Sequence, residues 1–460
     1  DFSFDEQRLG GSAFAQSLGK VGSDVPTVQN PEYFRDAFLA IQDLINKGLI
    51  LAGHDISAGG LITTLLEMCF ANMEGGMEIN LDKINCDDIV KILFAENPGI
   101  VIQVADKHKT EVKQILENAG VGYIKLGKPT EERHILVTKD DATYQFGIDY
   151  LRDIWYSTSY LLDRKQSMNG CAKKRFENYK QQPVEFAFDP SFTGKLSQFG
   201  LNPDRRTPSG IKAAIIREKG TNGEREMAYI LYLAGFDVKD VTMTDLISGR
   251  ETLEDINMIV YCGGFSNSDV LGSAKGWAGS FLFNPKAKAA LDNFYARKDT
   301  LSLGVCNGCQ LMMELGLITP EDEKKGKMLH NDSHKFESSF VGVTVPMNRS
   351  VMFGSLSGSK LGIWVAHGEG KFSLPYDEDH YNVVLKYSYD EYPGNPNGSD
   401  YSIAGIASKD GRHLAMMPHL ERAFFPWQNA YYPLNRLHED QITPWMEAFV
   451  NARVWIENNK

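Results

Sequence analysis

The stretch 303–312 reads LGVCNGCQLM and places Cys306 in a G-x-C-x-G frame. Cys306 directly follows the apolar run 300–305, which is typical of a buried strand, and directly precedes an apolar helical stretch. Flanking glycines permit the sharp strand-to-helix turn that presents a nucleophile. The helix N-terminus favours a thiolate, and the backbone N–H of Asn307 would point to where an oxyanion forms. We therefore predict that Cys306 is the nucleophile of an α/β domain.

Two other interpretations of Cys306 and Cys309 are a redox pair and half of a zinc site. Zinc is disfavoured because the sequence has no second C-x-x-C and its other cysteines are scattered. A redox pair is disfavoured because thioredoxin-type motifs lack this glycine frame. We expect Cys309, one helical turn further on, to pack against the sheet. The other four cysteines are Cys69, Cys86, Cys171 and Cys262.

The chain from residue 210 onward alternates between strand and helix patterns. Apolar runs at 213–216, 258–262 and 300–305 have the length of buried strands, and a helical stretch follows the first of them at 224–234. Each run closes on a glycine-rich turn. This alternation predicts a doubly wound parallel sheet with its site at the carboxyl edge of the strands.

A thiolate nucleophile needs an acid/base partner, and the stretch 417–422, MPHLER, offers one. His419 and Glu421 are two residues apart, so on an extended segment both side chains would point the same way. The carboxylate could then orient the imidazole. The H-x-E pattern is weak alone but gains weight beside a cysteine on such a turn.

The preceding sequence divides into a mixed region, 1–165, and a polar connector, 166–208. The spacing of apolar residues predicts a helix over 34–45, and the short apolar runs 89–93 and 99–104 have the length of strands. The connector carries charged and glutamine-rich stretches and little core of its own. An ordinary extension of either neighbour is the alternative.

Composition excludes several classes of function. The 460 residues include 48 Lys and Arg against 60 Asp and Glu, a formal net charge of −12. That balance argues against a nucleic-acid partner. No apolar run reaches the ~18 residues that a membrane span needs, and the first residues do not resemble a secretory signal. We expect a soluble, cytoplasmic protein with no membrane partner.

Nine short stretches occur in an order that is specific to one family, and the chain resembles the large, single-chain phosphoribosylformylglycinamidine synthases along essentially its whole length. The resemblance implies an α+β synthetase C-terminal-type domain at 1–165 and a doubly wound class I glutamine amidotransferase domain at 209–460. Because the family's proteins are far longer, it also implies a C-terminal fragment. The matching stretches are 9–16, 53–61, 217–226, 263–266, 269–272, 275–277, 334–338, 366–370 and 395–399.

The resemblance implies a carbon–nitrogen ligase that takes its amido group from glutamine. The full enzyme would use ATP and Mg²⁺ to convert formylglycinamide ribonucleotide to its amidine in purine synthesis, and this chain would carry the glutaminase. The expected catalytic residues are Cys306, His419 and Glu421. The residues expected to form the oxyanion and glutamine site are Gly264, Phe265, Asn307 and Gln310.

The stretch 53–61, GHDISAGGL, suits a phosphate and a cation on its own chemistry, since a glycine turn opens a helix beside hard oxygen ligands. By resemblance, Asp55 would help hold Mg²⁺ and Ser57 would touch the nucleotide. Ala58 stands where many relatives carry Asp, and the other magnesium ligands would lie in a domain outside this chain. A plain helix cap that binds nothing is the alternative.

The glutaminase part also departs from the family's pattern at two places. Leu420 stands where relatives often have Pro, and Asn267-Ser268 stands where they often have Tyr-Gly.

Two rival functions also stay open. One is a stand-alone cysteine hydrolase that cleaves a small amide, and the other is a non-catalytic fragment.

Overall fold

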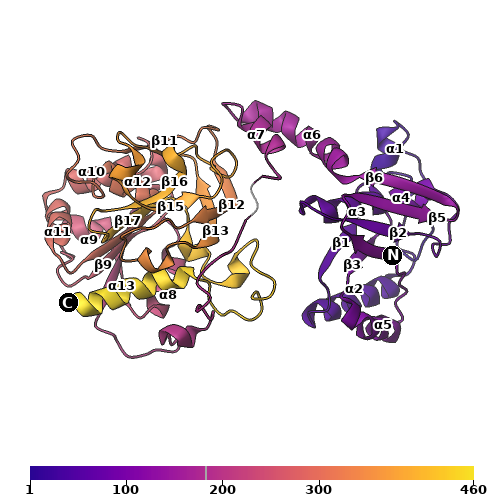
Figure 1. The fold of residues 1–460 in the computed structure, drawn as a ribbon, viewed down its shortest axis with the longest axis horizontal. Helices are drawn as coiled ribbons and strands as arrows, with labels where there is room; N and C mark the ends of the chain where they lie inside the picture. Colours follow the sequence, from indigo (N-terminus) through magenta and orange to yellow (C-terminus); the bar gives the residue numbers. More distant parts are fainter. Residues whose placement is uncertain (182–183) are drawn as a thin grey trace. The chain divides into compact units, whose positions relative to one another are not determined.

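The computed structural model describes residues 1–181 and 184–460 of the chain (Figure 1). It divides into two compact units, Asp1–Ser159 and Tyr160–Lys460. The predicted connector, 166–208, falls within the second unit, and its residues 182 and 183 lie outside the described residues. In the described parts of the chain, no helix combines the length and the apolar character that a membrane crossing requires.

The first unit builds its core around a four-stranded sheet, in the order β4-β2-β5-β6, and an antiparallel pair, β1-β3. Helix α3 buries Leu61, Leu65 and Cys69 in a cluster that includes Ile79 of β2. The strands are β1 Ala52–Ile56, β2 Gly76–Asn80, β3 Gly99–Gln103, β4 Gly127–Thr130, β5 His134–Lys139 and β6 Ala142–Gly147. The helices are α1 Ala13–Ser17, α2 Pro31–Asn46, α3 Gly60–Phe70, α4 Ile89–Phe94, α5 Lys109–Asn118 and α6 Ile148–Gln166, which continues into the second unit.

Two of the three elements predicted for this unit are confirmed, and one is wrong. The helix predicted over 34–45 lies within α2, and the run 99–104 forms β3. The run 89–93 forms helix α4 rather than a strand. The Asp88 side chain accepts hydrogen bonds from the backbone N–H groups of Val90 at 2.9 Å and Lys91 at 3.3 Å, and such a cap begins a helix.

The second unit contains a nine-stranded sheet in the order β13-β12-β15-β16-β17-β10-β9-β7-β8. The five strands from β17 to β8 run parallel, as predicted, and the strands from β13 to β17 add an antiparallel extension. The strands are β7 Lys212–Arg217, β8 Asp237–Thr242, β9 Met258–Tyr261, β10 Leu301–Val305, β12 Glu337–Thr344, β13 Lys360–His367, β15 Asn382–Tyr387, β16 Ile403–Ala407 and β17 His413–Met416. A separate pair is formed by β11 Lys327–Leu329 and β14 Lys371–Ser373.

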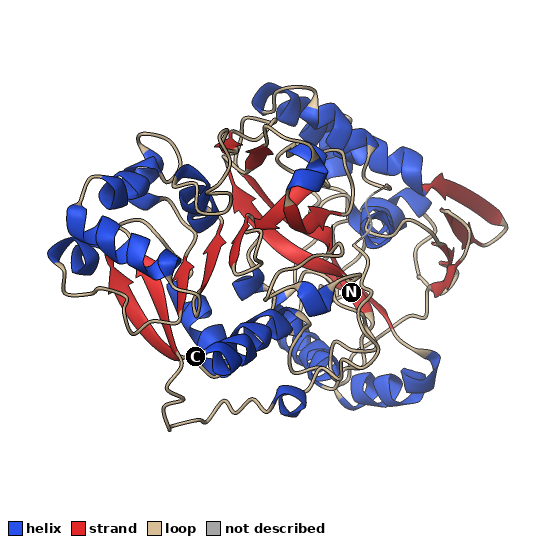
Figure 2. Ribbon diagram, turned by 60° about the vertical axis from the view of Figure 1, so that its left-hand side comes forward, coloured by secondary structure: helices blue, strands red, loops and turns tan. Residues whose placement is uncertain are grey.

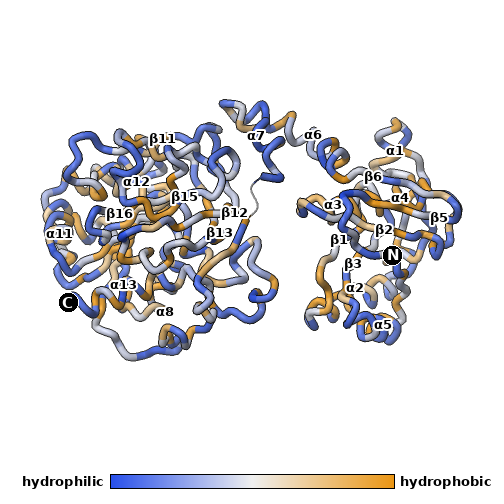
Figure 3. The backbone as a smooth tube through the Cα atoms, in the orientation of Figure 1, coloured by the Kyte–Doolittle hydropathy of each residue, from blue (hydrophilic) through white to orange (hydrophobic). Residues whose placement is uncertain are grey.

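Helices enclose this sheet (Figure 2). Helix α8 packs against α13, and α10 packs against α11 and α12. The central strands β9 and β10 are buried along their whole length, and Figure 3 shows hydrophobic stretches toward the middle of the unit with hydrophilic loops outside. The helices are α7 Cys171–Glu177, α8 Glu224–Leu233, α9 Met243–Ser248, α10 Lys275–Leu282, α11 Pro285–Ala296, α12 Asn307–Glu314 and α13 Trp445–Asn459.

Short 3₁₀ helices complete both units, and two of them, η3 and η7, lie at the carboxyl edge of the parallel strands. The 3₁₀ helices are η1 Asp106–His108, η2 Leu196–Phe199, η3 Ser266–Asp269, η4 Gly354–Leu356, η5 Glu378–His380, η6 Asp400–Ser402, η7 Leu420–Arg422 and η8 Pro426–Gln428.

Candidate active site

Cys306 stands on a strained turn between β10 and α12. Its backbone has φ 53° and ψ −106°, a conformation that residues other than glycine rarely adopt. Both glycines of the frame are required by close packing. A Cβ on Gly304 would lie 2.5 Å from the Gly308 carbonyl oxygen, and a Cβ on Gly308 would lie 2.1 Å from that of Tyr261. The Cys306 N–H donates to the Met416 carbonyl at 2.9 Å, which fixes the turn on β17.

His419 and Glu421 form a buried pair beside this turn. The His419 Nδ1 donates to the Glu421 Oε1 at 2.6 Å, and the two residues are 2% and 1% exposed. The extended segment expected for the pair is wrong beyond His419, because the chain curls there into η7. The turn bends the Glu421 carboxylate back to the ring, while the His419 N–H donates to the Trp364 carbonyl at 2.9 Å and anchors the segment on β13.

Gly263 is the common neighbour of the cysteine and the histidine. A Cβ at this position would lie 2.8 Å from the His419 Cε1 and 3.3 Å from the Cys306 Cβ. Burial alone would lower the pKa of His419, but the charges of Glu421 and Cys306 raise that pKa to about 10. The imidazole therefore favours its protonated form when the thiol is ionised. Because Glu421 engages the Nδ1, the buried Nε2 is the ring nitrogen that remains to exchange a proton.

The loop after β9 supplies one backbone donor to the site. No hydrogen bond joins the N–H of Gly264 or of Asn307 to another group in the described parts of the chain. The Phe265 N–H instead donates to the Gly220 carbonyl at 2.9 Å. The N–H groups of Gly264 and Asn307 are thus not used by the backbone of the described residues, and Phe265 contributes its half-exposed ring, whose centroid lies 5.9 Å from that of Phe336.

The side chains of Asn307 and Gln310 hold the site together. The Asn307 Oδ1 accepts from the Ser266 N–H at 3.1 Å, and its Nδ2 donates to the Gln310 Oε1 at 2.9 Å. The Gln310 Nε2 donates to the Glu369 carbonyl at 2.7 Å. Both ends of the Gln310 amide are thus engaged within the protein, which fixes the loop after β9 to the loop after β13.

Sequence reasoning missed two half-buried carboxylates at this site, Asp269 and Glu369. Burial raises the pKa of Asp269, with a smaller contribution from the charge of Glu369. The Asp269 Oδ1 accepts from the Ala274 N–H at 3.2 Å and from the Asn307 Nδ2 at 3.3 Å. Both carboxylates stand in stretches that carry the resemblance, 269–272 and 366–370, but spacing alone gave no sign of a role.

The second expected site lies in the first unit and is arranged differently from a phosphate cradle. Asp55 and Ser57 are exposed, and the Asp55 carboxylate lies 3.4 Å from the His54 Nδ1. The Gly59 N–H at the start of α3 donates to the Glu96 Oε1 at 2.8 Å, and the Ala13 N–H donates to the same oxygen at 2.7 Å. The Glu96 carboxylate therefore occupies the place expected for a phosphate.

These residues do not form a magnesium site by themselves. The described residues contain no group of three or more His, Cys, Asp or Glu side chains that could hold a metal ion. One exposed carboxylate supplies few of the roughly six oxygen ligands that Mg²⁺ requires.

Comparison with known proteins identifies the second unit. The family profile described as "CobB/CobQ-like glutamine amidotransferase domain" matches residues 210–456. The chain belongs to this amidotransferase family. A second profile, "AIR synthase related protein, C-terminal domain", matches residues 4–140. The predicted order, a synthetase C-terminal-type domain followed by an α/β amidotransferase, is confirmed.

The predicted resemblance to phosphoribosylformylglycinamidine synthase is also confirmed. The chain is 40% identical, over 100% of its length and 34% of the relative's, to "Probable phosphoribosylformylglycinamidine synthase, chloroplastic/mitochondrial" of Arabidopsis thaliana. It is 38% identical, over 98% of its length and 35% of the relative's, to the phosphoribosylformylglycinamidine synthase of Homo sapiens. The chain thus spans about a third of the length of these relatives.

A solved structure titled "Structure of PurLQS from Thermotoga maritima" is 29% identical, covers 54% of this chain and 98% of its own, and gives a TM-score of 0.39.

Proposed function

We propose that residues 209–460 hydrolyse glutamine to glutamate and ammonia. The observation that supports this most strongly is the buried His419–Glu421 pair beside a cysteine on a strained strand-to-helix turn, within an amidotransferase domain. The Cys306 thiolate adds to the side-chain amide carbon of glutamine. The oxyanion then accepts hydrogen bonds from the N–H groups of Gly264 and Asn307, each contributing on the order of a few kcal/mol.

His419 moves the proton in both halves of the reaction. Its Nε2 gives a proton to the departing nitrogen as the C–N bond breaks, which releases ammonia and leaves a γ-glutamyl thioester on Cys306. The neutral imidazole then takes a proton from water as the water attacks the thioester. The C–S bond breaks, glutamate is released, and the Cys306 thiolate is restored. Glu421 holds the Nδ1–H tautomer throughout.

The ammonia would serve an ATP-dependent ligase that makes formylglycinamidine ribonucleotide from formylglycinamide ribonucleotide in purine synthesis. The names of the relatives support this assignment. The nucleotide substrate and most of the Mg²⁺ and ATP site would belong to synthetase domains outside these 460 residues. Asp55 and Ser57 would add a carboxylate and a hydroxyl to that site. A cytoplasmic location is part of the same proposal.

Glutamate release from this chain tests the proposal. We expect glutamate and ammonia from glutamine but no ammonia from asparagine or a small peptide amide, and neither product from Cys306→Ser, whose thermal unfolding should match that of the parent chain. Equal rates on several amides would favour a stand-alone amide hydrolase. No release from glutamine would leave the non-catalytic alternative.

A second measurement concerns MgATP. We expect glutamate release to be the same with and without MgATP or the phosphoribosyl substrate. The reason is that Glu96 already accepts the Gly59 N–H, and that the described residues place no group of three or more His, Cys, Asp or Glu side chains around Asp55 that could hold a metal ion. Clear stimulation by either ligand would mean that a complete regulatory site lies within these residues.

A further inference from the structure

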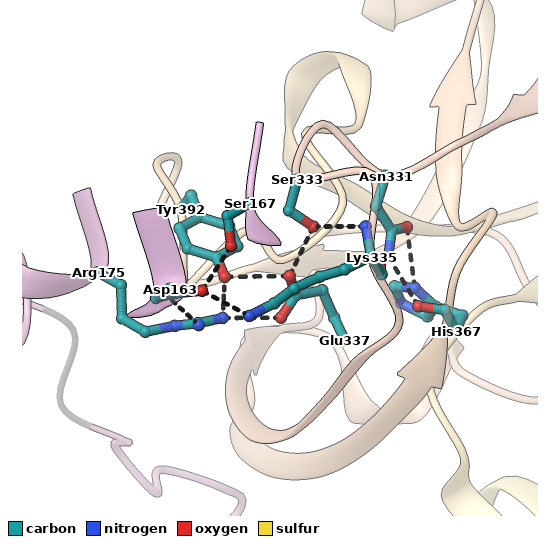
Figure 4. A network of polar contacts seen from close by, with 9 residues as sticks. All are labelled: Asp163, Ser167, Arg175, Asn331, Ser333, Lys335, Glu337, His367 and Tyr392. Atoms are coloured by element: carbon teal, nitrogen blue, oxygen red, sulfur yellow. Dashed lines mark hydrogen bonds and ion pairs between the residues drawn. The ribbon is translucent and has the colours of Figure 1, made fainter. Parts of the chain in front are cut away.

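A network of buried and partly buried polar side chains joins the end of helix α6 and helix α7 to the loop 331–337 (Figure 4). Asp163, in the last turns of α6, accepts from the Lys335 Nζ at 2.8 Å and from the Arg175 Nη1 at 2.8 Å. The Ser167 hydroxyl donates to the same carboxylate at 2.6 Å. Asp163 is 8% exposed, so its charge depends on these donors.

Arg175 extends the network from Asp163 to Glu337. Its Nη2 lies 2.9 Å from the Glu337 Oε2, and its guanidinium stacks over the Tyr392 ring, 4.8 Å from the centroid. Glu337 is 4% exposed, and its Oε1 accepts from the Ser333 hydroxyl at 2.6 Å and from the Tyr392 hydroxyl at 3.0 Å. Burial raises the pKa of Glu337, and Ser333 and Arg175 oppose that rise.

Asn331, at the other end of the loop, is fully buried, and its side chain makes four hydrogen bonds. Its Nδ2 donates to the carbonyls of Lys335 at 3.0 Å and His367 at 2.7 Å. Its Oδ1 accepts from the Gly370 N–H at 3.0 Å and lies 3.1 Å from the His367 Nδ1. Because the two carbonyls fix the orientation of the amide, the Oδ1 is an acceptor and the His367 Nδ1 carries its proton. Burial lowers the pKa of His367 to about 3, so the ring is neutral.

The segment that Asn331 holds, 366–370, forms one wall of the candidate active site. The Ala366 carbonyl oxygen lies 3.5 Å from the Cys306 Sγ. The Glu369 carbonyl accepts from the Gln310 amide, and the Glu369 carboxylate accepts from the Ser273 N–H at 3.3 Å. A shift of this segment would therefore move groups that contact both the nucleophile and the loop after β9.

We propose that Arg175, Glu337 and Asn331 are positioning residues that hold the 366–370 segment at its working distance from Cys306. Through them, the α6–α7 segment sets the reactivity of the glutaminase site. The inference rests on the proposed glutaminase function. Within the second unit, Asp163 and Arg175 bond directly to Lys335 and Glu337, so a shift of the α6–α7 segment reaches the loop 331–337 through these contacts.

A second arginine offers a matched control. Arg205 lies 3.0 Å from the Asp237 carboxylate, and its guanidinium stacks over the Tyr232 ring at 4.9 Å from the centroid. Arg175 and Arg205 are similarly exposed, at 24% and 20% of their side chains. Asp237 begins the edge strand β8, however. In the described parts of the chain, the Arg205 guanidinium bonds to Thr207, Phe236 and Asp237 and not to the 366–370 segment.

The test compares Arg175→Met with Arg205→Met in the whole chain. Three quantities are measured on each variant: the thermal unfolding midpoint, kcat and KM for glutamine hydrolysis, and the rate at which iodoacetamide alkylates Cys306 in the folded protein. We expect both variants to lose similar stability. Only Arg175→Met should lose kcat/KM, by about tenfold, and change its alkylation rate, because small misplacements of a reacting group are costly. Arg175→Lys should recover part of the loss.

Glu337→Gln decides the matter if Arg175→Met does not fold, since glutamine keeps the shape and can still bond to Ser333 and Tyr392. We expect it to unfold near the parent temperature and to share the loss of kcat/KM. The inference would be overturned if the folded variant, Arg175→Met or Glu337→Gln, had a kcat/KM and a Cys306 alkylation rate within twofold of those of Arg205→Met. If the parent chain itself releases no glutamate, the proposed function fails, and the alkylation rates alone still judge the positioning network.

Discussion

Replacement of Glu421 by glutamine tests the proposed catalytic pair with little change in shape. The Glu421 Oε1 lies 2.6 Å from the His419 Nδ1 in a site that is almost fully buried. Burial alone lowers the pKa of His419, while Glu421 and Cys306 together raise it to about 10 from an ordinary value of 6.5. Without the carboxylate, the pKa should fall toward or below that ordinary value.

The size of the effect follows from that shift. One pKa unit corresponds to about 1.4 kcal/mol, so the carboxylate's share of the rise is on the order of a few kcal/mol. A glutamine can also donate to Nδ1 and favour the tautomer that cannot act as a base. We therefore expect the kcat for glutamine hydrolysis to fall by roughly 10²- to 10⁴-fold.

Steady-state glutamate release measures this loss, and Glu226→Gln is the matched control. Both glutamates lie near the Arg422 side chain, Glu226 at 3.8 Å and Glu421 at 4.0 Å. Glu226, however, is half-exposed and has no contact with His419. We expect the control to stay within about threefold of the parent chain, as surface charges contribute little. A Glu421→Gln rate within tenfold of the parent rate would mean that another group orients His419, and the proposed pair would be refuted.

Three further predictions follow from the same geometry. A glutamine-like electrophile should label Cys306 and not Cys309, because Cys309 is fully buried and burial raises the pKa of its thiol well above the ordinary value; peptide mapping that found the adduct on Cys309 would reverse this assignment. Gly308→Ala should cost about 1–3 kcal/mol of unfolding free energy and most of the activity, since its Cβ would meet the last carbonyl of β9, whereas Gly354→Ala, where nothing lies within 4 Å, should leave activity intact. The third prediction concerns pH. Because folding raises the pKa of His419, its pairing with Glu421 should stabilise the chain fully below pH 6.5 and progressively less as the pH rises toward 10. The difference in unfolding free energy between the parent and Glu421→Gln, measured in urea, should therefore shrink over this range, and a constant difference would contradict the raised pKa.

The sequence was sufficient to predict the elements that have strong local signals. The G-x-C-x-G frame predicts the turn at Cys306 because only a glycine fits where a Cβ would meet a backbone oxygen at 2.1–2.5 Å. The runs 213–216 and 258–262 are apolar throughout because both faces of a parallel sheet are covered, and they form β7 and β9. The helix over 89–94 was missed, although Asp88 stands where a helix cap is expected, because short apolar runs fit both a helix and a strand.

Contacts between distant residues could not be predicted in this way. Nothing local to Phe265 reveals that its N–H is engaged by Gly220, 45 positions earlier in the sequence, and nothing local to Gly59 reveals that Glu96 fills the expected phosphate position. Arg175 and Glu337 are 162 residues apart. Such pairs depend on the tertiary fold, so sequence patterns found the reacting groups but not the groups that hold them in place.

Backbone groups explain why much of the candidate site leaves no residue signature. The Cys306 N–H is fixed by the Met416 carbonyl, its sulfur lies against the Ala366 carbonyl, and Gln310 is fixed by the Glu369 carbonyl. A backbone carbonyl is the same in every residue type, so its position depends only on the path of the chain. The buried amide of Asn331 holds that path after β13, together with the amide of Asn397, which donates to the Gly370 carbonyl at 2.7 Å. A residue remote in sequence from Cys306 is therefore expected to control its reactivity.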